Sequence, residues 1–133
     1  MLKLLGSVCL FTLCLLLLPN GSMAAGPSSH VEGVLIDKAC SFKAETRIVG
    51  DHLEGGMLSA YLHARNCLLM PDCKKSGYGV FTYDQKYLTF DSAGNQKAAE
   101  LLQASKKEDD FRVEVTGEIQ GDTIKVFALR LLP

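Results

Sequence analysis

The fold is decided by residues 78–132, which read YGVFTYDQKYLTFDSAGNQKAAELLQASKKEDDFRVEVTGEIQGDTIKVFALRLL. Two short β-rich runs, residues 78–83 and 86–91, flank a two-residue connection at Asp84-Gln85, a pattern typical of a hairpin. A stretch with helical spacing follows, and its apolar residues repeat at i, i+3 and i+4. These are Ala98, Leu101 and Leu102.

This helix is expected to begin near residue 92 and to end near residue 107. Ser92 or Asn95 is the predicted N-cap, because a short polar side chain can accept a hydrogen bond from a free backbone N–H there. Lys106 and Lys107 place positive charge in the last turn, where the helix dipole favours it. The apolar stripe is expected to face the core.

The last third of the chain predicts two further strands. Phe111, Val113 and Val115 alternate with polar residues, which is typical of a half-buried strand. Residues 120–122 turn the chain, and residues 123–132 form the returning strand. Gly117 suits a bend or bulge in the first of these two strands. We expect these strands to supply the core residues Val113, Val115, Ile124 and Val126.

Upstream, residues 31–38 (VEGVLIDK) predict the first strand. Its apolar residues occur at both odd and even positions, which indicates a strand covered on both faces. Residues 39–56 are mixed and polar, and we expect a loop there. Residues 57–66 (MLSAYLHARN) contain no Gly or Pro and predict one short helix.

The complete order is then a strand, a helical insertion at about residues 39–77, two strands, a helix and two strands. Without the insertion this is β-β-β-α-β-β, the element order of a five-stranded OB barrel. We therefore expect a mainly β protein, with residues 30–133 forming a single OB-like domain with a helical insertion. The alternative is an open α+β sheet.

The first residues predict export. Residues 1–24 combine a positive start at Lys3, an apolar run at 8–18 and small residues at Ser22 and Ala24, which is typical of a cleaved signal peptide. The run is shorter than the roughly 20 residues of a membrane-spanning helix, so no stable membrane insertion is expected after cleavage. Residues 25–29 are expected to be a flexible linker, and the protein to be periplasmic or extracellular.

The charge balance argues against nucleic acid as a partner. The 133 residues include 14 Lys and Arg against 15 Asp and Glu, a net charge of −1, whereas nucleic-acid binders usually carry a basic excess. Glycine-rich phosphate loops, paired catalytic carboxylates and Ser/His/Asp signatures are absent from the sequence. A non-enzymatic binding or structural module is therefore the favoured function.

Three cysteines follow the predicted signal peptide: Cys40, Cys67 and Cys73. Pairing is the default in an oxidising compartment, but an odd number leaves one thiol over, which is free to join two chains. The simplest interpretation is one disulfide that stabilises the insertion by about 2–3 kcal/mol.

A metal site is the main alternative. His63 and Cys67 are four residues apart on the predicted helix, so both side chains face one way. Cys73 and Cys40 would complete a Cys3His set, which zinc and other thiophilic metals accept in tetrahedral form.

Other roles for these residues are less favoured. One is thiol-redox or nucleophilic chemistry, with Cys67 or Cys40 beside His63. Another is haem or copper bound through His63 with Met57 or Met70, although the sequence has no C-x-x-C-H for covalent haem attachment. His30, His52, Asp37 and Lys38 are expected to be solvated.

Aromatic residues concentrate on the predicted second and third strands. They are Tyr78, Phe81, Tyr83, Tyr87 and Phe90. OB domains often bind ligands on that face, and aromatic rings can stack on bases. Ordinary core packing and cross-strand pairing are the favoured interpretation.

The chain resembles a group of small exported bacterial proteins of unknown function with an OB-like domain and a Cys/His-bearing insertion. The resemblance spans most of the chain after the predicted signal peptide, and it implies the fold and export but no specific activity. It is carried by GVLIDKAC at 33–40, His63, Cys67, Cys73, GYG at 77–79, VTGE at 115–118 and GDTIKV at 121–126.

Overall fold

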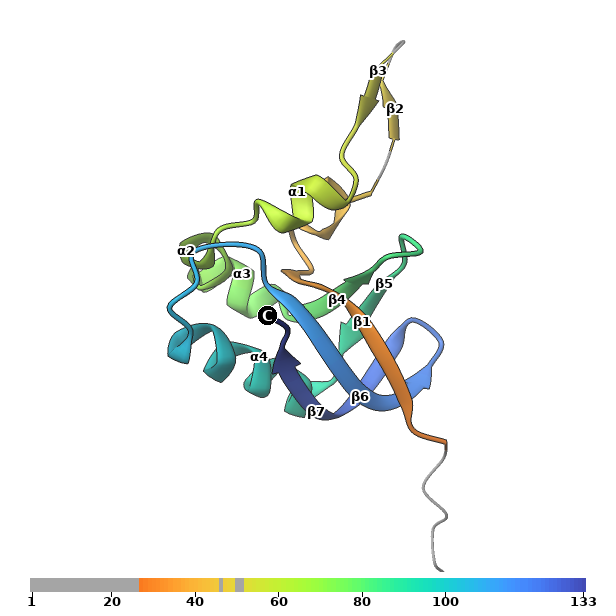
Figure 1. The fold of residues 1–133 in the computed structure, drawn as a ribbon, viewed down its shortest axis with the longest axis vertical. Helices are drawn as coiled ribbons and strands as arrows, with labels where there is room; N and C mark the ends of the chain where they lie inside the picture. Colours follow the sequence, from red (N-terminus) through yellow and green to blue (C-terminus); the bar gives the residue numbers. More distant parts are fainter. Residues whose placement is uncertain (1–26, 46, 50–51) are drawn as a thin grey trace, which may run out of the picture.

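The computed structural model describes residues 27–45, 47–49 and 52–133 (Figure 1). Five strands form one mixed sheet with a few helices around it, so the chain is of the α+β class. The strands are β1 (Ser29–Asp37), β4 (Tyr78–Thr82), β5 (Tyr87–Phe90), β6 (Arg112–Gln120) and β7 (Thr123–Leu131). The predicted signal peptide lies outside the described residues. The predicted linker reaches into the sheet, because Ser29 already belongs to β1.

The strand pairings form a closed circuit in the order β1-β4-β5-β7-β6. β1 pairs antiparallel with both β4 and β6, so it joins the two ends of the series. β4 and β5 form the expected hairpin, and β6 and β7 form a second one. The remaining pair, β5 with β7, is parallel.

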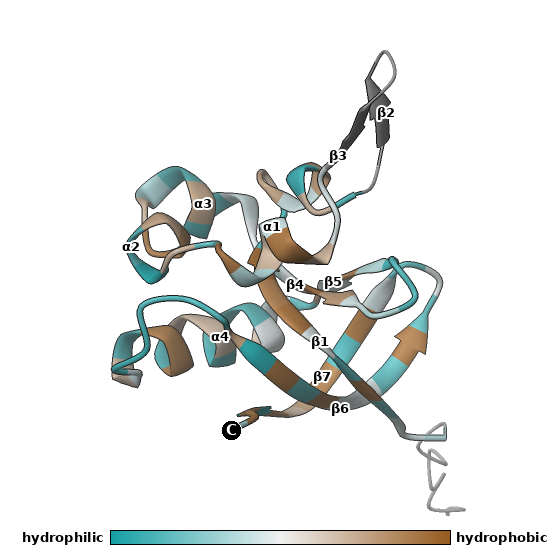
Figure 2. Ribbon diagram, turned by 45° about the horizontal axis from the view of Figure 1, so that its top comes forward, coloured by the Kyte–Doolittle hydropathy of each residue, from teal (hydrophilic) through white to brown (hydrophobic). Residues whose placement is uncertain are grey.

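The alternation predicted for the last third of the chain is confirmed. In β6 the side chains at 113 and 115 are buried and their neighbours are partly exposed, an alternation that is also visible as changing hydropathy in Figure 2. The pairing with β7 shifts register between Thr116 and Gly117. A Cβ at Gly117 would lie 2.3 Å from the Lys125 carbonyl oxygen, so the close approach of the two backbones at this bulge requires glycine.

β1 is covered on both faces, as its sequence predicts. Leu35 belongs to the main core, together with Val113, Val115 and Ile124. Val34 and Ile36 point to the other face and form a second apolar cluster, which also contains Ala44, Ala60 and Phe81. The segment between β1 and β4 supplies two of these residues, so it covers the outer face of the sheet.

The helix between β5 and β6 is α4 (Ser92–Ala104), and it packs mainly against β7. Its N-cap is Asp91 rather than Ser92 or Asn95. One carboxylate oxygen of Asp91 accepts hydrogen bonds from the backbone N–H groups of Gly94 (3.0 Å) and Val126 (3.1 Å). Asp91 therefore caps the helix and also attaches it to β7. Asn95 instead accepts from the backbone N–H of Tyr78.

The insertion between β1 and β4 contains more structure than predicted. Within the expected loop at 39–56 lie a short 3-10 helix, η1 (Ser41–Lys43), and a hairpin of β2 (Arg47–Val49) and β3 (His52–Glu54). The helical part comprises α1 (Met57–Tyr61), α2 (Arg65–Leu68) and α3 (Pro71–Ser76). Among the described residues, no helix combines the length and apolar character needed to cross a membrane.

The single helix predicted at 57–66 is wrong. A continuous helix would bond the Arg65 N–H to the Tyr61 carbonyl. Instead, Tyr61 accepts from the Asp110 N–H at 2.8 Å, and the Arg65 N–H donates to the Glu108 carbonyl at 2.7 Å. The segment before β6 thus forms hydrogen bonds with both the Tyr61 carbonyl and the Arg65 N–H. Ala64 is extended between α1 and α2.

Candidate metal centre

The four residues predicted as metal ligands come from four places around the insertion. Cys40 lies in the turn after β1, His63 in the break between α1 and α2, Cys67 in α2 and Cys73 in α3. We call these four residues the Cys/His cluster. Asp37, the last residue of β1, lies against it.

The ligand atoms of the cluster fall into two groupings that share Cys40. The atoms of Cys40, His63 and Cys67 are all within 4.8 Å of one another, and the same is true of Asp37, Cys40 and Cys73. The cysteines lie 4.3–4.5 Å apart and are unbridged. Tetrahedral zinc with Zn–S bonds of about 2.3 Å separates its sulfurs by about 3.8 Å, so cysteines 4.3–4.5 Å apart would have to approach each other by about half an ångström.

Asp37 connects the cluster to the sheet. It is fully buried, and its Oδ2 lies 3.1 Å from Nε2 of His63. Its Oδ1 accepts from the backbone N–H of Cys40 at 3.0 Å. Burial by itself would raise the pKa of Asp37, but the contacts with His63, the Cys40 amide and the Cys73 thiol hold the pKa below its usual value. The expectation that Asp37 is solvated is therefore wrong, whereas Lys38 is exposed.

His63 is buried, with 9% of its surface exposed. Because Nε2 faces the Asp37 carboxylate, Nδ1 is the ring nitrogen left to bind a metal. A metal-bound histidine commonly donates its other N–H to a carboxylate, which fixes the tautomer and the orientation of the ring. The Asp37–His63 pair therefore has the arrangement of a metal ligand and its supporting carboxylate.

Burial raises the pKa of two of the thiols. It raises the pKa of Cys73 to about 12, and the negative charge of Asp37 acts in the same direction. The pKa of Cys40 is also raised, by burial and then by Asp37. Both residues are therefore neutral thiols at pH 7 without a cation. A metal would bind their thiolate forms, so binding must release protons.

Helical spacing is not what brings His63 and Cys67 together, since His63 lies outside both helices. Their proximity results from the chain break at Ala64 and from the packing of the insertion against β1. Sequence reasoning also missed Asp37. The signal was present: a carboxylate at the end of a strand buried on both faces, three residues before Cys40.

The aromatic residues considered as a ligand face do not share one surface. Tyr78 and Phe81 are buried in the two different apolar clusters. Tyr87 is half-buried, with its hydroxyl 3.4 Å from the Ile36 carbonyl oxygen, while Tyr83 is exposed. Phe90 belongs to the main core.

The other residues considered at the sequence level lie apart from the cluster or at its margin. Met57 packs against the second apolar cluster, and Met70 is exposed. His30 is exposed, with Nδ1 3.2 Å from Oγ1 of Thr116. The side chain of His52 lies outside the described part of the structure.

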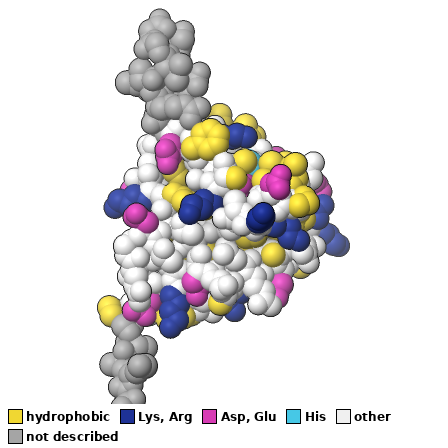
Figure 3. All heavy atoms as spheres, turned by 180° about the vertical axis from the view of Figure 1, so that it is seen from behind, with side chains coloured by type: hydrophobic (Ala, Val, Ile, Leu, Met, Phe, Trp, Pro, Cys, Tyr) yellow, Lys and Arg dark blue, Asp and Glu magenta, His cyan; other side chains and the backbone are white. Residues whose placement is uncertain are grey.

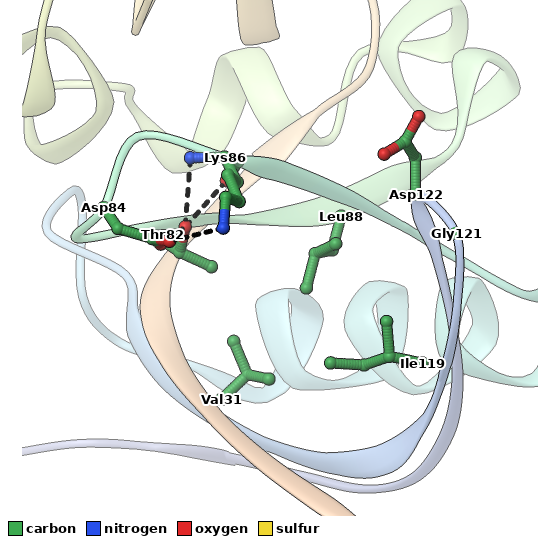
Figure 4. Close-up of a pocket in the computed structure, with 8 residues that line it drawn as sticks. All are labelled: Val31, Thr82, Asp84, Lys86, Leu88, Ile119, Gly121 and Asp122. Atoms are coloured by element: carbon green, nitrogen blue, oxygen red, sulfur yellow. Dashed lines mark hydrogen bonds and ion pairs between the residues drawn. The ribbon is translucent and has the colours of Figure 1, made fainter.

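A cavity of about 460 Å³ lies between the β4–β5 and β6–β7 turns (Figure 4). Val31, Leu88 and Ile119 form its apolar part, while Lys86 and Asp84 form an ion pair at its rim. The full lining is Val31, Thr82, Asp84, Lys86, Leu88, Ile119, Gly121 and Asp122, and it includes no cysteine or histidine.

The surface carries exposed apolar side chains on the insertion. Phe42, Leu58, Leu62 and Met70 are each about half exposed or more. In the view from behind, hydrophobic side chains gather on the upper half of the molecule, interspersed with basic and acidic groups (Figure 3).

Comparisons with protein-family models, curated proteins and solved structures found no match to this chain.

Proposed function

We propose that this is an exported metal-binding protein that holds one thiophilic ion, such as Zn²⁺, in the Cys/His cluster. The observation that carries the proposal is the buried contact between His63 and Asp37 beside three thiols. Three sulfurs and one nitrogen are a usual ligand set for tetrahedral zinc. The carboxylate behind the imidazole is the support that such ligands usually have.

A second candidate is a binding or structural module tied by one disulfide, as the sequence first suggests. The separation of 4.3–4.5 Å between the cysteines favours it, since a small approach would allow a bond. A disulfide uses only two cysteines, however, and gives no role to the buried His63–Asp37 pair. The metal site uses all of these groups.

We further propose that the closed sheet is an OB-like barrel. Three observations support this: the circuit β1-β4-β5-β7-β6, the parallel β5–β7 pair, and the position of α4 between β5 and β6. They agree with the β-β-β-α-β-β order of an OB barrel, and the closed circuit favours it over an open sheet. Export is proposed from the signal-peptide pattern at 1–24.

The test is a zinc titration of the fully reduced protein under anaerobic conditions, in competition with a chromophoric chelator. We expect about one ion per chain, released by strong chelator or by acid because the ligands must be deprotonated. His63→Ala should abolish retention. His30→Ala is the matched control, because it removes an exposed histidine from β1 and should change nothing.

Failure to retain zinc in the reduced wild-type protein would contradict the metal site, and so would equal retention by His63→Ala. The disulfide alternative makes a different prediction. In the protein without residues 1–24, it leaves one titratable thiol per chain in denaturant without reductant, whereas the metal site leaves all three.

A further inference from the structure

We infer that the metal site is under redox control: a disulfide between Cys40 and Cys67 and a bound metal exclude each other. This inference rests on the proposed metal-binding function and adds its regulation. The ligand atom of Cys40 lies within 4.8 Å of those of Cys67 and Cys73, and these three thiols are the same groups that would hold the ion.

Cys40 is the decisive residue because it belongs to both groupings of possible ligands. One grouping joins it with His63 and Cys67, and the other with Asp37 and Cys73. A disulfide through Cys40 therefore removes a ligand from both sets at once. The remaining thiol and the imidazole would be left without the shared sulfur.

Accessibility selects Cys67 as the partner of Cys40. Cys67 is half-buried, whereas Cys73 is buried and interacts with the Asp37 carboxylate. Thiol–disulfide exchange requires access of the reagent to the attacking sulfur. From a separation of 4.3–4.5 Å, the two sulfurs must approach by about 2.4 Å to reach the bond length of a disulfide.

The oxidant is a low-molecular-weight disulfide, the class of reagent that exchanges with thiols. The thiolate of Cys67 or Cys40 attacks one sulfur of the reagent, whose S–S bond breaks and releases the first thiol. The other cysteine then attacks the mixed disulfide, forms the Cys40–Cys67 bond and releases the second thiol. Two cysteines are oxidised, one reagent disulfide is reduced to two thiols, and the two cysteine protons end on those thiols.

The experiment exposes the reduced wild-type protein to oxidised glutathione, with and without bound zinc. Metal-free protein should form one intramolecular disulfide, assigned to Cys40 and Cys67 by peptide mapping. The oxidised protein should then bind no zinc, and a reductant should restore binding. Zinc-loaded protein should react at least about tenfold more slowly, because coordination occupies the attacking thiolates.

Two variants, each checked for folding by circular dichroism, test the pairing. Cys73→Ala keeps the Cys40–Cys67 pair and should form the disulfide as the wild type does. Cys67→Ala lacks one of the two cysteines and should form no disulfide efficiently. The assignment would be overturned if Cys40 and Cys73 formed a disulfide efficiently in this variant and also in the wild type.

The outcomes separate this inference from the proposed function. If the reduced wild-type protein takes up no zinc, the metal site itself is refuted. If it takes up zinc but the zinc-loaded form oxidises as fast as the metal-free form, only the redox control is refuted. Retention of zinc by the oxidised protein would also refute only the redox control.

Discussion

Replacing Asp37 by asparagine keeps the size of the side chain and removes its charge. In the wild type, Oδ2 lies 3.1 Å from Nε2 of His63; in the proposed site the ring would donate its proton at Nε2 and bind the metal through Nδ1. The side-chain amide introduced by the substitution would itself donate a hydrogen bond to Nε2, which moves the ring proton to Nδ1. The nitrogen needed for coordination would then be blocked.

We expect Asp37→Asn to weaken zinc binding by about 10- to 100-fold, the usual effect of losing the carboxylate behind a histidine ligand. That loss corresponds to about 1.4–2.8 kcal/mol of binding free energy. Asp37 is fully buried, and two of its contacts are the hydrogen bond from the Cys40 amide at 3.0 Å and the pair with His63. Losing a hydrogen bond to a charged group costs about 1.5–3 kcal/mol of stability, so the variant should remain folded if the wild type has ordinary stability.

The assay is zinc competition with a chromophoric chelator at pH 7, accompanied by a urea titration. Asp84→Asn is the matched control, because Asp84 is an exposed carboxylate at the β4–β5 turn. It should bind zinc as the wild type does. An Asp37→Asn protein that is folded and binds zinc with wild-type affinity would refute the supporting role of Asp37.

Three further predictions concern the fold. Gly94→Ala should destabilise the protein by about 1–3 kcal/mol in thermal unfolding, because the new Cβ would lie 2.5 Å from Cγ2 of Val126. This loss is expected even though alanine usually favours a helix. An unchanged or higher Tm would contradict this close packing. Leu102→Ala should lower the free energy of unfolding by about 2–5 kcal/mol in a urea titration, since Leu102 is fully buried. Leu101→Ala should lower it less, because Leu101 is only partly buried. Equal losses would show that the two positions are packed alike. Burial, and then the charges of Asp37 and Cys73, raise the pKa of Tyr78 to about 12 from 10, so the contribution of Tyr78 to stability is present below pH 10 and is lost as the pH rises toward 12. Tyr78→Phe should therefore reduce the loss of unfolding free energy between about pH 9 and 11.5 by an amount on the order of 2 kcal/mol. An identical loss in both proteins would exclude Tyr78 as a cause.

The sheet was largely predictable from the sequence because its strands follow local rules. Alternating residues in β6 predict one buried face, and apolar residues at both odd and even positions of β1 predict a strand buried on both faces. Both predictions are confirmed. The closed circuit was less accessible, because the parallel β5–β7 pair depends on contacts between segments distant in the chain. The predicted N-cap of α4 is wrong. Asp91 caps the helix and also accepts a hydrogen bond from Val126 of β7, and a local sequence pattern does not reveal that second contact.

The candidate site was predicted for reasons that were partly wrong. Residue type and spacing predict the cysteines and His63 as ligands, but no single helix aligns His63 with Cys67. The backbone groups of Tyr61 and Arg65 bond instead to residues 108–110, more than 40 positions further along the chain. A charged residue after a strand usually lies in an exposed turn, so the sequence predicts a solvated Asp37, whereas in the structure Asp37 is fully buried.

The insertion leaves and re-enters the sheet at directly paired residues, Asp37 of β1 and Tyr78 of β4. Geometrically, a tight turn could therefore replace residues 38–77 without disturbing the circuit of strands. Chemically it could not, because Val34, Ile36 and Phe81 on the outer face are completely shielded and would meet water. A shortened descendant of this protein would need polar side chains at those three positions, so loss of the cluster and a polar outer face would have to evolve together.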